Sequence, residues 1–333
     1  MDIFVAIIFL VVGFVMLVKG ADWFVDGAAG VAGKLRIPAL VIGLTVVAFG
    51  TSAPELAVSV SSAVKKDVGI AIGNVIGSNI TNILLILGLS ALFTALPVQK
   101  ESRLVDFPVL VAASGILVLF GAFDNEIGRL EGGVMFGLLI AYTAFLIINA
   151  LKHRNDAPMV ELNNHEVVGE EEKKSGFSAW YEKMKANTWF LLVILVVGLG
   201  IVVGGAQLAV NGATTIAEEL GISSRIIGLT VVAIGTSLPE LITSVMAARK
   251  GETDIAVGNI VGSNIFNILM VAGVSALITP LPFAQSFAID GCIALGAALL
   301  LCVFGYIKNH KVGRVGGILM LLGFVGYYVY LFI

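Results

Sequence analysis

The sequence predicts an all-α integral membrane protein, with ten transmembrane helices arranged as two five-helix repeats of inverted topology. Three observations predict this fold: the composition, a series of long apolar stretches and an internal repeat. Of the 333 residues, 58% are hydrophobic and 13% are charged, and the mean hydropathy is +1.01. Soluble domains carry about 25% charged residues, so the composition excludes an ordinary soluble enzyme, a disordered protein and a nucleic-acid binder.

Ten apolar stretches are long enough to cross a bilayer, which takes about 20 residues in a helix. Several exceed what a perpendicular crossing needs, so tilted or interrupted helices are expected. The predicted spans are residues 3–30, 38–64, 69–94, 104–122, 132–150, 189–217, 226–248, 255–278, 287–307 and 315–333.

An even number of spans places both termini on one side of the membrane, and the basic residues indicate which side. With both termini outside, 15 of the 20 Lys and Arg residues fall in cytoplasmic segments and four in outside segments. Cytoplasmic loops are enriched in Lys and Arg, so we expect both termini outside. The polar stretch 151–188 is then a cytoplasmic linker between a first membrane half, 1–150, and a second, 189–333.

The two halves contain the same motif. Residues 43–96 align with residues 228–281 without a gap, at a constant offset of 185, and about three-fifths of the positions are identical. Residues that are 185 apart are called equivalent below. Because each half holds an odd number of predicted spans, the second half enters the membrane upside down relative to the first. Inverted repeats of this kind occur in secondary transporters, whose substrate sites lie near mid-membrane.

Each repeat interrupts a span with a Gly-Thr-Ser-x-Pro-Glu motif, at residues 50–55 and 235–240. Proline lacks an N–H and clashes with the carbonyl four residues earlier, so the motif is expected to free a main-chain oxygen at membrane depth. Such a break is tolerated only where it faces protein or a wet cavity. Glu55 and Glu240 follow directly, and a carboxylate within the bilayer indicates an ion path.

The next span of each repeat carries a second row of polar residues, spaced four apart so that they share a helix face. Hydrogen bonding between packed helices is the simpler interpretation for the first member of each row. The later members are expected to line a site between the halves. The rows are Asn74, Ser78 and Asn82, and Asn259, Ser263 and Asn267.

These residues together form a set of oxygen ligands without His, Cys, Lys or Arg, which suits a hard cation. Two glutamates balance the charge of one Ca²⁺, whereas several Na⁺ would be needed. An empty site would carry two uncompensated charges, so movement across the membrane would require a bound cation. Exchange of one cation for another would follow, and protons would compete with cations for the carboxylates.

The segments GTSAPE with GSNITN, and GTSLPE with GSNIFN, closely resemble the two alpha-repeats of the Ca²⁺/cation antiporter superfamily, specifically its sodium/calcium exchangers. The resemblance implies a Na⁺/Ca²⁺ antiporter that works by alternating access, in which the first and sixth helices slide across the rest. It implies that Ca²⁺ binds Glu55, Glu240 and the carbonyls of Thr51 and Thr236. It assigns Na⁺ to Ser52, Ser237, Ser78, Ser263 and the carbonyls of Ala48 and Ala233, with Asn82 and Asn267 at the centre.

Several alternatives remain at this point. Potassium-dependent relatives carry Asp where Asn267 stands, and the proton/calcium branch usually has an acid after the Gly-Asn pair, so Na⁺ is favoured as counter-ion. A cation channel fits an inverted repeat less well. An intramembrane hydrolase would need a His, Lys or metal-ligand partner that these spans lack. We therefore expect no enzyme activity and no cofactor, with Ca²⁺, Na⁺ and the lipid bilayer as partners and neither nucleic acid nor a protein partner. The resemblance and the size favour a plasma (inner) membrane.

Three charges lie within the first predicted span: Lys19, Asp22 and Asp26. Their spacing on a helix favours a local ion pair, with a role in lining a path to the site as the alternative.

Overall fold

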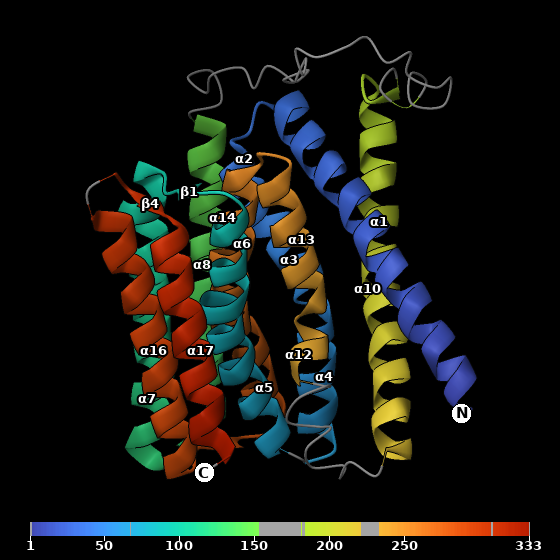
Figure 1. Ribbon diagram of the computed structural model, residues 1–333. Helices are drawn as coiled ribbons and strands as arrows, with labels where there is room; N and C mark the ends of the chain where they lie inside the picture. Colours follow the sequence, from blue (N-terminus) through green and yellow to red (C-terminus); the bar gives the residue numbers. More distant parts are fainter. Residues whose placement is uncertain are drawn as a thin grey trace.

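The computed structural model describes residues 2–66, 68–152, 181, 184–220, 233–307 and 309–332. These residues form a bundle of helices (Figure 1). The elements of the first half are α1 (Ile3–Leu35), α2 (Ala39–Ile42), the π-helix η1 (Gly43–Val47), α3 (Ala48–Thr51), α4 (Ala53–Val64), α5 (Val68–Ile80), the π-helix η2 (Thr81–Leu87), α6 (Gly88–Phe93), β1 (Leu96–Pro97), the π-helix η3 (Ser102–Asp106), α7 (Phe107–Asp124), β2 (Glu126–Ile127) and α8 (Arg129–Lys152).

The second half begins after the predicted linker, most of which lies outside the described residues. Its elements are α10 (Thr188–Glu219), α12 (Ala233–Thr236), α13 (Leu238–Arg249), α14 (Thr253–Phe266), the π-helix η5 (Asn267–Ala272), α15 (Gly273–Ile278), β3 (Leu281–Pro282), α16 (Gln285–Tyr306), β4 (Lys311–Val312) and α17 (Arg314–Phe332).

The protein is an all-helical, multi-pass membrane protein. Within the described residues, eight helices are long and apolar enough to cross a membrane, and a ninth span results if α2–α3 and α4 are counted together. The predicted span 226–248 is described only from residue 233 onward. The predicted count of ten is therefore tested only in part.

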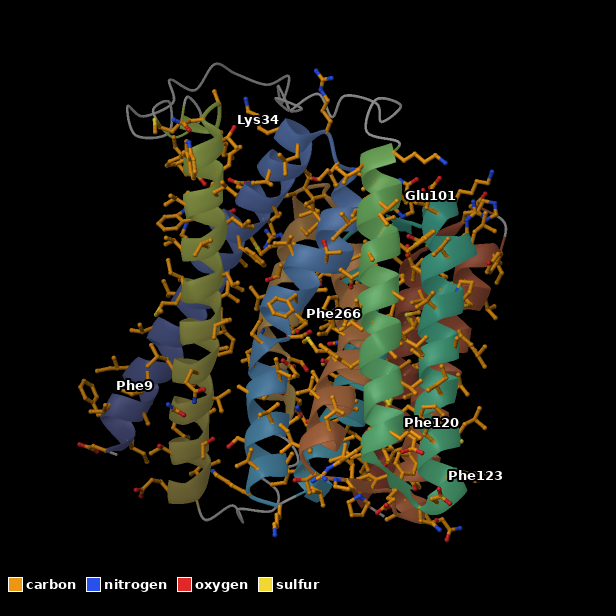
Figure 2. The ribbon with its side chains drawn as sticks, turned by 180° about the vertical axis from the view of Figure 1, so that it is seen from behind. Phe9, Lys34, Glu101, Phe120, Phe123 and Phe266 are labelled. Carbon is orange, nitrogen blue, oxygen red and sulfur yellow. The ribbon has the colours of Figure 1, made fainter. Side chains whose placement is uncertain are left out.

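The outside of the bundle is apolar, as expected for a surface in lipid. Phe123 of α7 is 86% exposed, and Figure 2 shows it on the outer side of the bundle. By contrast, Phe266 of α14 is buried. Its ring packs edge-on against the ring of Phe49, with 5.9 Å between the ring centroids. The exposed apolar surface runs along the helices, which is the arrangement that a bilayer requires.

The two predicted helix breaks are present. The chain leaves helical geometry at Ser52, between α3 and α4, and the segments Ala39–Thr51 and Ala53–Val64 are bent by 46° relative to each other. An equivalent break at Ser237 separates α12 from α13. In both cases the proline lies in the first turn of the following helix, where its missing N–H costs no hydrogen bond. The motif therefore ends one helix and starts the next.

Equivalent segments run in opposite directions. In Figure 1, α4 lies below α3, whereas α13 lies above α12. Likewise α1 ends at the top of the view, where α10 begins. The end of the bundle at which α1 and α8 finish and α10 starts is called the linker end below.

Helices α1 and α10 are packed unusually closely. Gly13, Gly20 and Gly27 recur every seven residues on α1, and a Cβ on any of them would lie 2.6–2.8 Å from a backbone atom of α10. The equivalent glycines of α10 are Gly198, Gly205 and Gly212, which touch the backbone of α1 in the same way. Glycine is needed here because only a residue without a side chain lets two helices approach to backbone contact.

The four short strands join the two halves to each other. Leu96 of β1 pairs with Val312 of β4, and Leu281 of β3 pairs with Ile127 of β2. Because β1 is equivalent to β3 and β2 to β4, the two pairings are equivalent as well. Each strand pair therefore ties the end of a central helix in one half to the outer helices of the other.

Helix α14 lies at the centre, buried without interruption from Ile255 to Phe266. Three polar side chains lie in this buried stretch: Asn259, Ser263 and Asn264. The central position of α14, next to α3 and α13, brings these side chains to the two helix breaks. The candidate site therefore lies in the interior of the bundle.

Candidate functional site

Two fully buried carboxylates, Glu55 and Glu240, lie in the first turns of α4 and α13. Each carboxylate belongs to the third residue of a helix that starts directly after the break at Ser52 or Ser237. The first-turn position is electrostatically favourable, because the N-terminal end of a helix carries a partial positive charge. The sequence therefore folds locally so that each acid faces the interior of the bundle at a helix start.

Each carboxylate is bonded by the serine at the break of the other half. Ser52 Oγ donates a hydrogen bond to Glu240 Oε1 at 3.1 Å, and Ser237 Oγ donates to Glu55 Oε1 at 3.3 Å. The two contacts are equivalent by the offset of 185. Since each serine lies three residues before its own glutamate, the crossed bonds bring both breaks and both acids to one place.

The other oxygen of each carboxylate is buried and has no hydrogen-bond partner among the described residues: Glu55 Oε2 and Glu240 Oε2. The same holds for both amide atoms of Asn82 and of Asn267, which are fully buried. Buried polar atoms are nearly always paired, so unpaired ones at equivalent positions of both halves indicate atoms that are available to a ligand.

Hydroxyl groups complete the surroundings of the two acids. Ser237 Oγ lies 3.4 Å from Ser78 Oγ, and Thr51 Oγ1 lies 3.5 Å from Ser263 Oγ. Thr51 Oγ1 also lies 3.4 Å from the carbonyl oxygen of Ala48. All five residues are buried. Helix α12 extends from Ala233 to Thr236 and ends directly before Ser237.

Two asparagines hold the breaks in position from the neighbouring helices. Asn259 Nδ2 donates to Ser244 Oγ on α13 at 2.8 Å, while its Oδ1 accepts from Thr51 Oγ1 of the other half at 3.0 Å. Asn74 makes the equivalent bonds to Ser59 at 3.0 Å and to Thr236 at 3.5 Å. The expectation that these two asparagines bond between helices is thus confirmed.

The amide of Asn74 also donates to the main-chain carbonyl of Glu55 at 3.2 Å. The sequence analysis did not predict that Ser59 and Ser244 accept hydrogen bonds from Asn74 and Asn259. Each lies four residues after its glutamate, one helical turn on, which is the only signal that could have found them.

All twelve predicted site residues lie at or beside the two breaks, or on the two polar rows. None of the side chains in the contacts above carries a positive charge. Carboxylate, hydroxyl, amide and carbonyl oxygens are the ligands of Ca²⁺ and of similar hard cations. The arrangement can therefore hold a cation between two acids without a competing protein cation.

The expectation of a local ion pair between Lys19 and the acids of α1 is wrong. Asp22 and Asp26 pair with Lys250, which follows α13, and Asp26 also pairs with Lys185. The spacing on α1 would have allowed Lys19, but lysines from other elements reach the acids instead.

The family model described as "Sodium/calcium exchanger protein" matches residues 5–148 and 190–333. The chain belongs to the sodium/calcium exchanger family. The two matched segments leave out the linker, and they include both helix breaks and both polar rows.

Individual members of the family are similar over nearly the whole chain. CaxA of Alkalimonas amylolytica is 39% identical over 331 residues, covering 98% of this chain and 99% of that protein. The sodium/calcium exchanger MaX1 of Methanosarcina acetivorans is 35% identical, covering 97% of each. A solved structure of the sodium-calcium exchanger NCX_Mj superposes with a TM-score of 0.83 at 33% identity, covering 98% of this chain and 99% of that one.

Proposed function

We propose that this protein is a secondary active antiporter that exchanges Na⁺ for Ca²⁺ across the membrane by alternating access, and not an enzyme. The observation that carries the proposal is the pair of crossed bonds between Ser52 and Glu240 and between Ser237 and Glu55. These bonds leave one buried oxygen of each acid without a partner. The family relationship gives the proposal independent support.

The two acids would bind a single Ca²⁺ between them, with the carbonyls of Thr51 and Thr236 as further ligands. Sodium would be shared among the serine hydroxyls and two carbonyls when Ca²⁺ leaves. Asn82 and Asn267 would lie at the centre, where their buried amide oxygens are unpaired. The proposed Na⁺ ligands are Ser52, Ser237, Ser78, Ser263, Ala48 and Ala233.

Charge compensation would couple the two ions. Two carboxylates removed from water are costly unless cations neutralise them. One Ca²⁺ or several Na⁺ would do so, whereas the empty site would retain two negative charges. The change of access would then be allowed only with a loaded site, which makes transport an exchange.

The domain organisation in the proposal is that of two membrane repeats, 1–150 and 189–333, joined by a linker, 151–188. The opposite directions of α4 and α13 support an inverted relationship between the repeats. Alternating access in such proteins moves one repeat against the other around a fixed site, and we propose that the two access states arise here as the halves interchange their conformations. Helices α1 and α10, which correspond to the first and sixth spans, would move together because of their glycine contacts.

We place the protein in the plasma (inner) membrane with both termini outside and the linker in the cytoplasm, on the strength of the Lys and Arg distribution. A relative from Escherichia coli is named inner membrane protein YrbG and is 34% identical, covering 95% of this chain and 93% of that protein. Asn at both central positions favours K⁺-independent transport.

Transport from a Na⁺ gradient tests the proposal. Vesicles loaded with Na⁺ are diluted into Na⁺-free buffer that contains labelled Ca²⁺, with and without K⁺, and uptake is followed for wild type, Glu55→Gln and Glu240→Gln. We expect Ca²⁺ uptake that requires the Na⁺ gradient, does not depend on K⁺ and is lost in both variants. Uptake driven by a pH gradient alone would favour proton exchange, and conductance without a counter-ion would favour a channel.

A further inference from the structure

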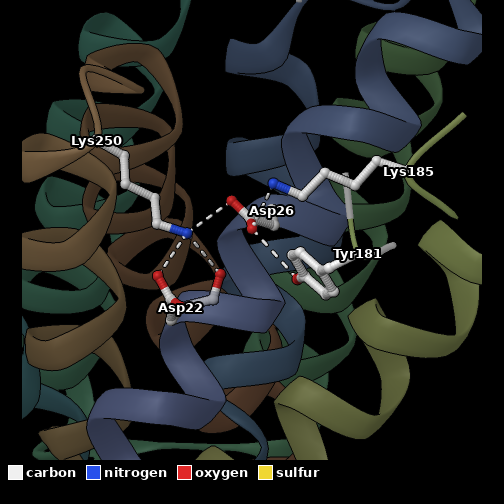
Figure 3. Close-up of polar contacts among 5 residues, drawn as sticks. All are labelled: Asp22, Asp26, Tyr181, Lys185 and Lys250. Atoms are coloured by element: carbon white, nitrogen blue, oxygen red, sulfur yellow. Dashed lines mark hydrogen bonds and ion pairs between the residues drawn. The ribbon is translucent and has the colours of Figure 1, made fainter. Parts of the chain in front are cut away.

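A cluster of four charged side chains joins α1 to the end of α13 and to the residues before α10 (Figure 3). Lys250 directly follows α13. Its Nζ lies 2.7 Å from Asp22 Oδ1 and 2.6 Å from Asp26 Oδ1, and it donates to the main-chain oxygen of Asp22 at 2.8 Å. An ammonium group has three donors, and all three are used here.

The second oxygen of Asp26 is bonded from the other side. Lys185 Nζ lies 2.9 Å from Asp26 Oδ2, and the hydroxyl of Tyr181 donates to the same oxygen at 3.3 Å. Two acids and two lysines make the cluster neutral. Their side chains are between 18% and 36% exposed, so salt screens these pairs less than it screens charges on an open surface.

The equivalent positions at the opposite end of the bundle lack the acids. Asp22 is equivalent to Gln207 and Asp26 to Asn211, both on α10, while Lys250 is equivalent to Lys65 at the end of α4. Gln207 and Asn211 are hydrogen-bonded to each other at 2.9 Å. The two ends therefore share the lysine, but neutral amides stand at one end where the other end has the two acids.

We infer that Lys250 is a positioning residue, which holds α1 against α13 at the linker end and makes the two access states unequal in free energy. The inference rests on the proposed interchange of conformations between the halves. In the alternative state, Lys65 would meet Gln207 and Asn211. Neutral amides can accept a hydrogen bond from an ammonium but form no ion pair with it, so the alternative state lacks the stabilisation that Lys250 gives to the present one.

Hydrogen exchange of the backbone amides measures the contact without any transport. In Lys250→Met, we expect faster exchange in the linker-end part of α1, residues 22–35, by roughly three- to tenfold, the size expected for partly exposed ion pairs. Lys250→Arg should keep the wild-type rate. The matched control is Arg249→Met, which removes an equal charge from the exposed neighbouring position. Equal exchange in Lys250→Met and Arg249→Met would overturn the inference.

A reverse experiment adds the acids to the other end. The double variant Gln207→Asp and Asn211→Asp supplies partners for Lys65, so it should stabilise the alternative state. Half-saturating Ca²⁺ concentrations, measured separately from the two faces of sided vesicles, should fall on one face and rise on the other. The sense should be the same in this variant and in Lys250→Met, because both changes favour the alternative state. Shifts of opposite sense in the two variants, or no shift in either, would contradict the inference. A wild type without Na⁺-driven uptake would instead refute the proposed function, while the exchange measurement would still test the contact.

Discussion

Ser52 and Glu240 are 188 residues apart in the sequence, yet the serine hydroxyl donates to the glutamate Oε1 at 3.1 Å inside the bundle. The equivalent pair, Ser237 and Glu55, repeats the contact at 3.3 Å. The carboxylate of each half is therefore oriented by the serine at the helix break of the other half. Both carboxylates are bonded across the halves, so this arrangement of two acids requires both halves.

The crossed bonds can be tested by removing one hydroxyl at a time. Ser52→Ala and Ser237→Ala should each raise the half-saturating Ca²⁺ concentration by about tenfold, because a hydrogen bond to a charged group is worth about 1.5–3 kcal/mol. Labelled Ca²⁺ uptake into vesicles gives the measurement. Ser61→Ala, on the exposed face of α4, is the matched control and should behave as wild type. Equal effects of Ser61→Ala and Ser52→Ala would argue against a specific role for the crossed bonds.

The bond between Thr51 and Asn259 should couple the two halves energetically. Thr51→Val keeps the side-chain shape but leaves the buried Asn259 Oδ1 without its donor, which costs about 1–3 kcal/mol. Asn259→Ala removes the partner as well. Each change in the half-saturating Ca²⁺ concentration is converted to a free energy. The sum for the two single variants should then exceed the value for the double variant by about 1 kcal/mol.

Thr236→Val with Asn74→Ala is the equivalent cycle in the other half, and it should give a smaller coupling, because that contact is longer, at 3.5 Å. Additive effects in both cycles would show that these asparagines do not hold the helix breaks.

The glycines between α1 and α10 should tolerate no side chain. In Gly198→Ala, the new Cβ would lie 2.6 Å from the backbone nitrogen of Phe24, and such overpacking costs about 1–3 kcal/mol. Gly200→Ala meets nothing within 4 Å and should stabilise the helix by about 0.5–1 kcal/mol. Thermal unfolding in detergent should therefore give opposite changes in Tm for two positions that are only two residues apart. A fall in Tm of equal size in both would rule out the close contact as its cause.

Much of the fold could be predicted from the sequence, because hydropathy is a property of neighbouring residues and the repeat is visible when the two halves are aligned. The breaks at Ser52 and Ser237 follow from the local chemistry of proline, and the oxygen-rich character of the site follows from the residue types of the repeated segments. The repeat also indicates which residues are equivalent. It does not indicate which residues touch, so the crossing of Ser52 to Glu240 could not be derived from it.

Other features depend on contacts that no local pattern records. The π-helix that begins at Asn267 follows a stretch with ordinary helical spacing, and nothing in the residue types distinguishes it from an α-helix. Lys250 pairs with Asp22 and Asp26 across 228 and 224 residues, whereas spacing alone favoured the nearby Lys19. In both cases tertiary packing decides the outcome, and local spacing is only a weak guide to it.

Direct Ca²⁺ binding to the purified protein tests the central claim, that Glu55 and Glu240 jointly hold one cation. Equilibrium titration in detergent, with and without Na⁺, should give one Ca²⁺ per chain for wild type, with Na⁺ competing for the site. Glu55→Gln and Glu240→Gln should each abolish that binding, although each retains the other acid. Binding of Ca²⁺ with wild-type affinity by either single variant would contradict a shared site.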